Sequence, residues 1–365
     1  MLDPTRLDPP TLLGRPELPL DWTAARRELA GARVLVTGAG GSVGSRLAET
    51  LLDLGPSRLT LLDHHDHALF GLRRRLDDLT RERPKSTASP TWSLALADVR
   101  DRGRMQRVLD DARPDVIFHM AAYKHVPFGE EFPEETFAVN VLATDQILRL
   151  AAERGIDRLV YPSSDKAVHP PSLYGATKRL SETLVGRFAL DLDQRFVAVR
   201  YVNILGTHGS AIETFAAQVA GGQALTITDA AMTRYWVSMP EAIWLVVQAA
   251  AIGAPGSVLM LDVTDEVPIV TIARRVEALV APGRPELPIR VTGLRPGERL
   301  REELLSEHEA FRNGPCTGLL EVVNQRRRAN LDVIHEFLEH LRALAEAGDG
   351  EGLKASAMNA ARALQ

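Results

Sequence analysis

The chain has 365 residues, of which 45% are apolar and 25% are charged, an ordinary globular composition that allows a sizeable core. Its formal net charge of −5 gives no overall basic field, which argues against nucleic acid or an anionic membrane surface as a partner. The single cysteine, Cys316, excludes an intramolecular disulfide and a cysteine metal cluster, and we predict no metal site. No stretch approaches the roughly 20 apolar residues that span a bilayer, and the acidic start is unlike a signal peptide, so we expect a cytoplasmic protein.

The first 30 residues are proline-rich with only a short helical pattern, so we expect an irregular arm that lies on the main body. After this arm, strand-like and helical runs alternate. Strands are expected at residues 33–38, 58–63, 91–98, 115–122, 158–164 and 195–206, and helices at 42–55, 67–83, 134–154 and after Pro171. This order predicts an α/β fold with a parallel sheet covered by helices on both faces.

A glycine-rich turn, TGAGGSVG at residues 37–44, separates the first expected strand from the helix that follows. Gly38, Gly41 and Gly44 allow a tight turn, close approach to a pyrophosphate and packing of the helix on the sheet. The N-terminus of the helix offers free N–H groups to phosphate. A strand, a glycine turn and a helix in this order are typical of a Rossmann-type dinucleotide site, whereas the alternative is a turn that only packs.

The second expected strand ends in Asp63, where an acid that binds ribose hydroxyls is expected. Its carboxylate favours NAD over NADP, but His64, His65 and the basic run at 73–75 could offset that charge, so both cofactors stay open. The predicted cofactor-binding residues are Thr37, Gly38, Gly40, Gly41, Ser42, Val43, Gly44, Asp63, His64, Asp98, Val99, Ala121, Ala122, Tyr174 and Lys178.

Tyr174 and Lys178 lie on one face of the helix that follows Pro171. A cationic neighbour is expected to lower the tyrosine pKa and make the phenol a usable base toward a sugar hydroxyl. The preceding strand ends in Ser163 and Ser164, at the sheet edge where ligands bind. Together these residues indicate the Ser–Tyr–Lys apparatus of short-chain dehydrogenases.

Asp165 and Lys166 follow Ser164 directly and place two opposite charges beside that apparatus. A simple dehydrogenase or epimerase needs neither side chain, so the pair suggests an additional acid and base. The alternative interpretation is a surface ion pair.

After Gly206 the strands become short, with expected strands at 224–228, 257–262 and 288–292. We therefore predict a Rossmann-type parallel sheet with helices on both faces plus a smaller C-terminal α/β substrate-binding domain. The expected segments are the arm at 1–30, the dinucleotide-binding domain at 31–205, a mainly substrate-binding domain at 206–330, and a C-terminal helix with a flexible tail at 331–365.

From about residue 33 to 305 the sequence resembles the UDP-N-acetylglucosamine 4,6-dehydratases of the polysaccharide-biosynthesis (CapD-like) family of extended short-chain dehydrogenases/reductases, and the soluble short type is the better comparison. The residues that carry this resemblance are the glycine turn, ADVRD at 97–101, HMAAYKHVP at 119–127, Asn140, SSDKAV at 163–168, YGATKR at 174–179, MTRY at 232–235 and RPGERL at 295–300.

The resemblance implies that Tyr174 removes the C4 hydroxyl proton while hydride passes from C4 to a tightly bound, recycled NADP or NAD. Lys166 then acts as the base at C5, Asp165 protonates the departing C6 hydroxyl, and Ser164 binds the C4 oxygen. Hydride returns to C6 and gives a UDP-4-keto-6-deoxy sugar, with or without inversion at C5. A Lys166 amine crowded by Lys178 and partly desolvated is expected to be neutral near pH 7.

The same resemblance implies a nucleotide-sugar partner, a UDP-N-acetylhexosamine, and a homo-oligomer, either a dimer or a hexamer. The predicted substrate-binding residues are Lys124, His125, Glu130, Asn203, Arg234, Arg295 and Glu298, the arginines because their planar fork pairs with phosphate oxygens. Arg46 replaces an expected acidic residue and His208 an expected arginine, which leaves the exact sugar open.

Two other functions stay open from the sequence. A nucleotide-sugar 4-epimerase uses the same scaffold, but Asp165 and Lys166 argue against it because epimerisation at C4 needs no acid and base at C5 and C6. A non-catalytic dinucleotide-binding protein would have no use for Tyr174 and Lys178 together.

Overall fold

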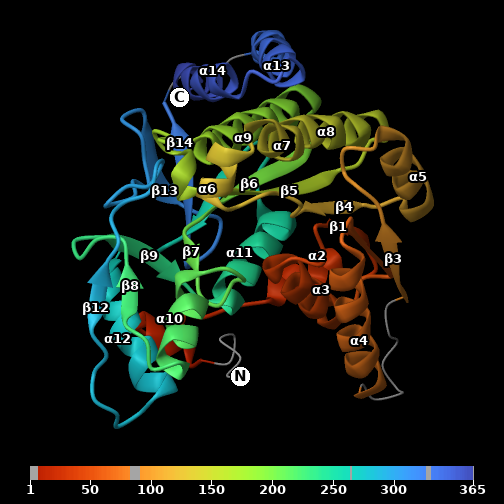
Figure 1. Cartoon of the computed structure of the whole chain (residues 1–365). Helices are drawn as coiled ribbons and strands as arrows, with labels where there is room; N and C mark the ends of the chain where they lie inside the picture. Colours follow the sequence, from red (N-terminus) through yellow and green to blue (C-terminus); the bar gives the residue numbers. More distant parts are fainter. Residues whose placement is uncertain (1–6, 83–90, 264, 326–329, 365) are drawn as a thin grey trace.

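The computed structural model describes residues 7–82, 91–263, 265–325 and 330–364. Within these residues the centre is a nine-stranded sheet in the order β13-β14-β10-β6-β5-β4-β1-β2-β3 (Figure 1). Its strands are β1 (Arg33–Thr37), β2 (Arg58–Asp63), β3 (Thr91–Leu96), β4 (Val116–His119), β5 (Arg158–Ser164), β6 (Arg195–Tyr201), β10 (Val258–Leu261), β13 (Glu309–Asn313) and β14 (Leu319–Asn324).

The strands from β3 to β10 in that order are parallel, whereas β14 and β13 pair antiparallel at the edge. β1 lies between β2 and β4, so the strand order reverses there. At such a reversal the loops that leave the carboxyl ends diverge and open a crevice for a ligand. This arrangement confirms the predicted fold class, a Rossmann-type parallel sheet with helices on both faces.

The strands are apolar on both faces because each face is covered. In β1, Val34 and Val36 belong to one core cluster, whereas Leu35 belongs to the other. The helices over the first face are α2 (Thr23–Leu29), α3 (Ser42–Leu54), α4 (Asp66–Glu82) and α11 (Met239–Ile252).

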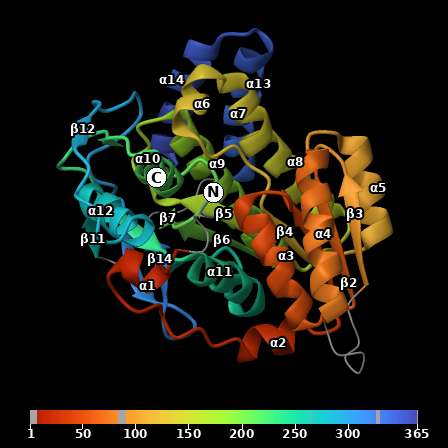
Figure 2. The same ribbon diagram turned by 60° about the horizontal axis from the view of Figure 1, so that its bottom comes forward.

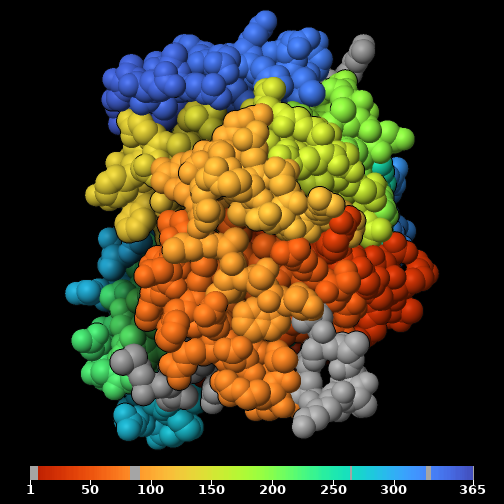
Figure 3. Space-filling view, turned by 90° about the vertical axis from the view of Figure 1, so that its right-hand side faces the viewer, coloured from red at the N-terminus to blue at the C-terminus, as the bar shows by residue number. Residues whose placement is uncertain are grey.

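The second face carries a thicker helical layer, made of α5 (Arg102–Ala112), α7 (Pro133–Phe137), a π-helical turn (Ala138–Leu142), α8 (Ala143–Glu153) and α9 (Leu173–Leu192). The short helix α6 (Val126–Glu131) precedes α7. Two C-terminal helices, α13 (Leu331–Glu346) and α14 (Gly350–Ala363), lie over this layer. Figure 3, which views the molecule from its β3 side, shows them in blue along the top.

Where the C-terminal helix and tail were predicted, the end of the chain forms α13 and α14. The Asp349 side chain accepts the Gly352 N–H and starts α14, and Leu353, Ala357 and Ala361 are buried in the core shared with α9. The neighbouring glycines suggested flexibility, but capping and burial of one helix face outweigh them.

The smaller lobe has its own core, formed between α10 (Ala211–Ala220) and α12 (Ile269–Val280). Its strands are β7 (Asn203–Ile204), β8 (Leu225–Ile227), β9 (Thr233–Val237), β11 (Glu266–Pro268) and β12 (Ile289–Val291). The predicted boundary at 206 does not separate two sheets, because β10, β13 and β14 come from the second segment and extend the central sheet. The completely buried run at 258–261 explains why this segment joins the main core.

The N-terminal arm contains the short helix α1 (Pro9–Leu13) beside α12 and α2 beside α3 and α11 (Figure 2). Between the two helices, the Arg15 guanidinium lies 2.6 Å from the buried Glu241 carboxylate. The Trp244 indole N–H also donates to the Asp21 carbonyl at 2.8 Å. The arm is therefore fastened to α11 by polar contacts as well as by packing.

Candidate active site

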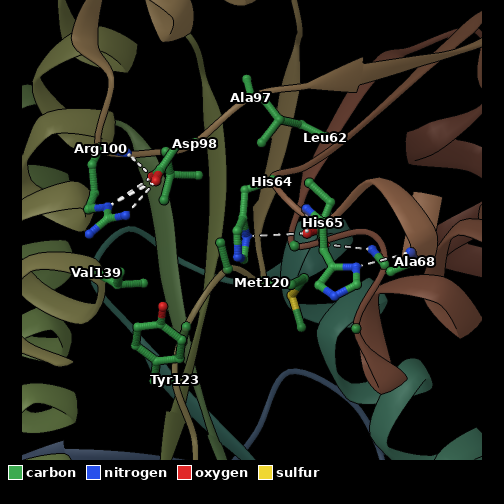
Figure 4. Close-up of a pocket in the computed structure, with 17 residues that line it drawn as sticks. Leu62, His64, His65, Ala68, Ala97, Asp98, Arg100, Met120, Tyr123 and Val139 are labelled. Atoms are coloured by element: carbon green, nitrogen blue, oxygen red, sulfur yellow. Dashed lines mark hydrogen bonds and ion pairs between the residues drawn. The ribbon is translucent and has the colours of Figure 1, made fainter. Parts of the chain in front are cut away.

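A cavity of about 270 Å³ opens at the carboxyl ends of β1, β2, β3 and β4, at the reversal of strand order (Figure 4). Its lining comes from the glycine turn, the ends of β2 and β3, and the segment after β4. The lining residues are Gly38, Gly40, Gly41, Leu62, Asp63, His64, His65, Ala68, Ala97, Asp98, Val99, Arg100, Met120, Ala121, Ala122, Tyr123 and Val139.

Two glycines make the turn possible. Gly38 has φ +66°, and a Cβ there would lie 2.6 Å from the Ala121 nitrogen. A Cβ on Gly44 would lie 2.1 Å from the Gly38 oxygen. Larger residues are excluded at both positions, and α3 begins at Ser42 with its first N–H groups free for an anion.

Six predicted cofactor residues do not line the cavity: Thr37, Ser42, Val43, Gly44, Tyr174 and Lys178. The Thr37 hydroxyl bonds His119 Nδ1 at 2.8 Å, and the Ser42 hydroxyl accepts the His208 N–H at 3.0 Å. These contacts hold the two ends of the turn.

Asp63 lies at the cavity wall with both carboxylate oxygens bonded to the backbone. One oxygen accepts the Gly40 N–H at 2.8 Å and the other accepts the His65 N–H at 2.9 Å. Each oxygen keeps a further lone pair, so the carboxylate still has acceptor capacity for a hydroxyl.

The opposite side of the cavity carries Asp98 and Arg100 (Figure 4). The Arg100 guanidinium lies 2.7 Å from Asp98 and 2.8 Å from Glu135, and its hydrogen bonds hold the pKa of Asp98 below its ordinary value. Two carboxylates already balance this guanidinium charge.

The segment after β4 is held by Asn140, which lies in the π-helical turn. Its side-chain oxygen accepts the Tyr123 N–H at 2.9 Å, and its amide donates to the Tyr123 carbonyl at 3.0 Å and to Thr177 at 3.1 Å. Ala121 and Ala122 therefore keep their place against the glycine turn. A π-turn at such a position is a frequent feature of functional sites.

The catalytic segment begins where β5 ends at Ser164 and a single 3₁₀ turn follows at Asp165–Ala167. Across from it, α9 starts with Ser172 as its N-cap. A Cβ on Gly175 would lie 2.2 Å from the Lys166 carbonyl, so this glycine allows the first turn of α9 to approach the 3₁₀ turn. The close approach brings Tyr174 next to Ser164 and Lys166.

Tyr174 is buried, and its phenol lies next to the Ser164 hydroxyl. Burial raises its pKa, and the Lys166 charge and the Ser164 hydrogen bond offset only part of that effect. The expectation that Lys178 lowers this pKa was wrong for the ligand-free protein, because the Lys178 amine lies 6.0 Å from the centre of the Tyr174 ring. Tyr174 is a neutral phenol in this state.

Lys178 is a buried amine whose Nζ donates to the Pro162 carbonyl at 2.7 Å. Burial lowers the pKa of Lys178 to about 7. Nearby His119 is fully buried, and burial together with Lys178 lowers its pKa to about 3. The interior below the site therefore disfavours positive charge.

Lys166 has the opposite environment. Its Nζ lies 3.0 Å from Asp165 Oδ1 and 3.3 Å from Glu302 Oε1. Burial lowers the pKa of Lys166, but the two carboxylates raise it by more, so the net shift is upward. The expectation of a neutral Lys166 crowded by Lys178 was therefore wrong: the amine with the lowered pKa is Lys178.

Asp165 Oδ1 accepts the Ser164 hydroxyl at 2.9 Å as well as the Lys166 amine. Its second oxygen, Oδ2, is buried and has no hydrogen-bond partner among the described residues. An unsatisfied buried carboxylate oxygen is costly, which indicates that a ligand is needed to complete this site.

The predicted substrate residues divide into two groups. In the first group, the side chains form hydrogen bonds within the protein. The Arg234 guanidinium donates to the carbonyls of Thr233, Leu300 and Arg299. The Asn203 amide donates to the Tyr235 carbonyl, and Glu130 accepts the Leu173 N–H at the start of α9.

The second group lies at the surface of the two loops beside the site. Lys124 donates to the His208 carbonyl at 2.6 Å, and His125 is the N-cap of α6 with its ring near Gly209. The Arg295 backbone N–H donates to the Glu298 carboxylate at 3.1 Å. The guanidinium of Arg295 has no hydrogen-bond or ion-pair partner among the described residues, so it is the better placed of the two predicted phosphate-binding arginines.

The sequence analysis missed Glu302. It stands two residues beyond the RPGERL segment and comes from a loop far along the chain, so neither spacing nor periodicity connects it to Lys166. Its side chain is 5% exposed. The sequence feature that could have indicated this residue is the glutamate pair Glu302-Glu303, which follows a glycine-containing loop.

A buried network of four charges was also missed. Arg200 pairs with Glu182 at 2.7 Å and with Glu309 at 3.0 Å, and Arg179 pairs with both carboxylates. Ser163 donates to Glu182 at 2.6 Å. This network ties the end of β5 to β13, the strand that follows the Glu302 loop.

These observations fit a dinucleotide across the crevice. The cavity offers acceptor capacity at Asp63, the turn approaches too closely for side chains at Gly38 and Gly44, and the first N–H groups of α3 face outward for an anion. Residues 34–322 match the family described as polysaccharide biosynthesis protein. The chain belongs to this family, as a CapD-like extended short-chain dehydrogenase/reductase.

Within the family, the chain is 37% identical over 298 residues to the probable polysaccharide biosynthesis protein EpsC of Bacillus subtilis, covering 82% of this chain and 49% of that protein. It therefore spans about half the length of this relative. It is 29% identical to a UDP-N-acetylglucosamine 4,6-dehydratase (inverting) of Campylobacter jejuni, covering 77% of this chain and 79% of that one. Among solved structures, Pen from Bacillus thuringiensis has a TM-score of 0.73 at 25% identity, covering 83% and 91% of the two chains.

Among the described residues of this family member, no helix is long and apolar enough to cross a membrane.

Proposed function

We propose that this protein is a nucleotide-sugar 4,6-dehydratase that converts UDP-N-acetylglucosamine to a UDP-4-keto-6-deoxy sugar. The observation that carries the proposal is the cluster at the sheet edge in which Ser164 and Lys166 both bond Asp165 and Tyr174 lies next to Ser164 and Lys166. It puts a phenol, a carboxylate and an amine next to one another, which is what oxidation at C4 and water loss across C5 and C6 require. The Campylobacter relative supports the choice of sugar.

A nicotinamide dinucleotide, NAD or NADP, supplies the acceptor that takes hydride from C4 and returns it to C6. Residues of this chain that would hold it are the glycine turn, Asp63, and the backbone at Ala121 and Ala122. Lys178 and Tyr174 would lie beside its reactive end.

The protons of the reaction must also balance. The water that leaves contains the C6 hydroxyl and, in net terms, the C4 hydroxyl proton. Tyr174 starts as a neutral phenol, so it takes the C4 proton while passing its own to Ser164, whose hydroxyl proton moves to Asp165. Asp165 then holds the proton that the departing C6 hydroxyl needs, and Tyr174 ends as it began.

Lys166 is the base at C5 in this proposal. The buried, unpartnered Oδ2 of Asp165 supports a place for the C6 hydroxyl next to the Lys166 amine. The Lys166 amine is then close to C5, and the Asp165 carboxylate is close to the oxygen on C6. Lys166 must lose a proton before it can act, because Asp165 and Glu302 raise its pKa and keep it cationic.

The nucleotide half of the substrate would lie against the small lobe. Arg295 offers a guanidinium for the diphosphate, and Glu298, Lys124 and His125 border the same opening. Arg234 acts here by holding the loop at residues 299–300.

The test is NMR of the purified protein with UDP-N-acetylglucosamine in heavy water. We expect a new C6 methyl signal from a 4-keto-6-deoxy product, with deuterium at C5, and its coupling pattern reports any inversion at C5. A C4 epimer without a methyl signal would replace the dehydratase by a 4-epimerase. Unchanged substrate with bound dinucleotide would reject this sugar as the substrate.

A further inference from the structure

Glu302 joins the catalytic pair to the small lobe. Its Oε1 lies 3.3 Å from Lys166 Nζ and 3.6 Å from Arg234 Nε, and its side chain is 5% exposed. Asp165, Lys166, Glu302 and Arg234 thus form a row of alternating charges, all largely removed from water.

Arg234 explains why Glu302 is held there. Its guanidinium donates to the carbonyls of Arg299 and Leu300, which precede Glu302 by three and two residues. The loop can therefore deliver its carboxylate to Lys166 with little freedom. Glu303, the next residue, points elsewhere: its carboxylate contacts His169 and Arg299, and it is 51% exposed.

Few groups near the Lys166 amine can accept its proton. Among the described residues, the carboxylates within 4.0 Å of its amine are those of Asp165 and Glu302. Asp165 is also the acceptor for the Ser164 hydroxyl, through which the C4 proton arrives. A second proton cannot be stored on Asp165 at the same time, so the proton of Lys166 needs the other carboxylate.

We propose that Glu302 is a positioning residue that docks the Lys166 ammonium beside Asp165 and takes its proton during turnover. This inference rests on the proposed function. The Lys166 N–H bond breaks and a Glu302 O–H bond forms, which leaves a neutral amine. The amine then removes the C5 proton, returns a proton to C5 when hydride reaches C6, and regains its own proton from Glu302, so no charge is left over.

The docking role can be tested without substrate or dinucleotide. The chain has five lysines, Lys85, Lys124, Lys166, Lys178 and Lys354, so protein labelled with ¹³C at lysine Cε gives few signals. Lys166→Arg assigns the signal of interest. We expect Glu302→Gln to lower the titration midpoint of Lys166 by roughly one to three pH units, because one of its two nearby anions is removed.

Glu303→Gln is the matched control, since it changes the neighbouring residue of the same loop and should leave the Lys166 midpoint unchanged. If Glu302→Gln also leaves it unchanged, Glu302 does not hold this charge and the proposal is rejected, whatever the enzyme acts on. Should Glu302→Gln fail to fold by circular dichroism, Glu302→Asp, which retracts the carboxylate, is expected to lower the midpoint by a smaller amount, and no change would again reject the docking role.

The proton-accepting role is tested by the pH dependence of dehydration. We expect the wild-type rate to be nearly independent of pH between 7 and 9, because the proton moves within the protein. Glu302→Gln should be at least ~10-fold slower at pH 7 and recover as pH rises, since hydroxide must then remove the proton. A uniform loss at every pH would reduce Glu302 to a structural role. Absence of any wild-type product overturns the proposed function, while the NMR titration still decides the docking role.

Discussion

Two amines beside the end of β5 have opposite electrostatic surroundings. Lys178, inside α9, donates to a backbone carbonyl, and burial lowers its pKa to about 7. Lys166, in the 3₁₀ turn after β5, is partly buried, with 21% of its side chain exposed, yet two carboxylates raise its pKa. Burial alone therefore does not decide the charge of a catalytic lysine; the carboxylates that the fold brings to it do.

The largest effect should come from replacing each amine by methionine. We expect Lys166→Met to lower kcat by about 10²–10⁴-fold with dinucleotide affinity unchanged, because in the proposed reaction this amine acts on the sugar. Lys178→Met should weaken dinucleotide binding as well as turnover. Product formation by NMR and dinucleotide affinity by calorimetry separate the two. Equal effects of the two variants on dinucleotide affinity would contradict the proposal that Lys166 acts on the sugar and Lys178 contributes to dinucleotide binding.

The next largest effect concerns the buried network that anchors the strand after the Glu302 loop. Arg200→Met leaves Glu182 and Glu309 buried with one cation fewer, so we expect a loss of about 3–5 kcal/mol in the free energy of unfolding. Urea denaturation measures it. Arg312→Met, which breaks a pair between exposed Arg312 of β13 and Glu321 of the neighbouring strand β14, should cost under about 1 kcal/mol. Similar losses of unfolding free energy in the two variants would show that burial of the network does not increase its contribution to stability.

The lowered pKa of Lys178 predicts a pH-dependent stability. Between pH 7 and about 10 the unfolded chain binds a proton at this lysine that the folded chain does not, so its contribution to stability rises with pH in that window. Lys178→Met should flatten this rise, whereas Lys166→Met should not, because the raised pKa of Lys166 keeps it protonated in both states there. Urea midpoints at pH 7, 8 and 9 provide the measurement. Parallel curves for wild type and Lys178→Met would refute a neutral Lys178.

The smallest effect is expected far from both amines, on the helix that covers α9. Asp349→Ala removes the cap of α14 and should cost about 1 kcal/mol of stability. The Lys166 and Lys178 signals should titrate as in the wild type, because α14 packs on the outer side of α9. A shift of either midpoint would mean that the position of α9 itself sets the environment of the amines.

Local patterns in the sequence were sufficient for the dinucleotide half of the site. The glycine turn, Asp63, Asp98 and Ala121 follow successive strands, and parallel strands bring their carboxyl ends to one edge. The fold class could be predicted for the same reason: strand and helix periodicities are local. The oligomeric state and the choice between NAD and NADP stay predictions.

The catalytic half required the tertiary structure. The sequence placed Ser164, Asp165, Lys166 and Tyr174 close together, but it could not give their protonation. That depends on Glu302, which reaches Lys166 from a loop far along the chain, and on the burial of Tyr174 and Lys178. It also could not predict that α14 packs as a helix. Charges and packing partners distant in sequence act through space, so their effects appear only when the chain has folded.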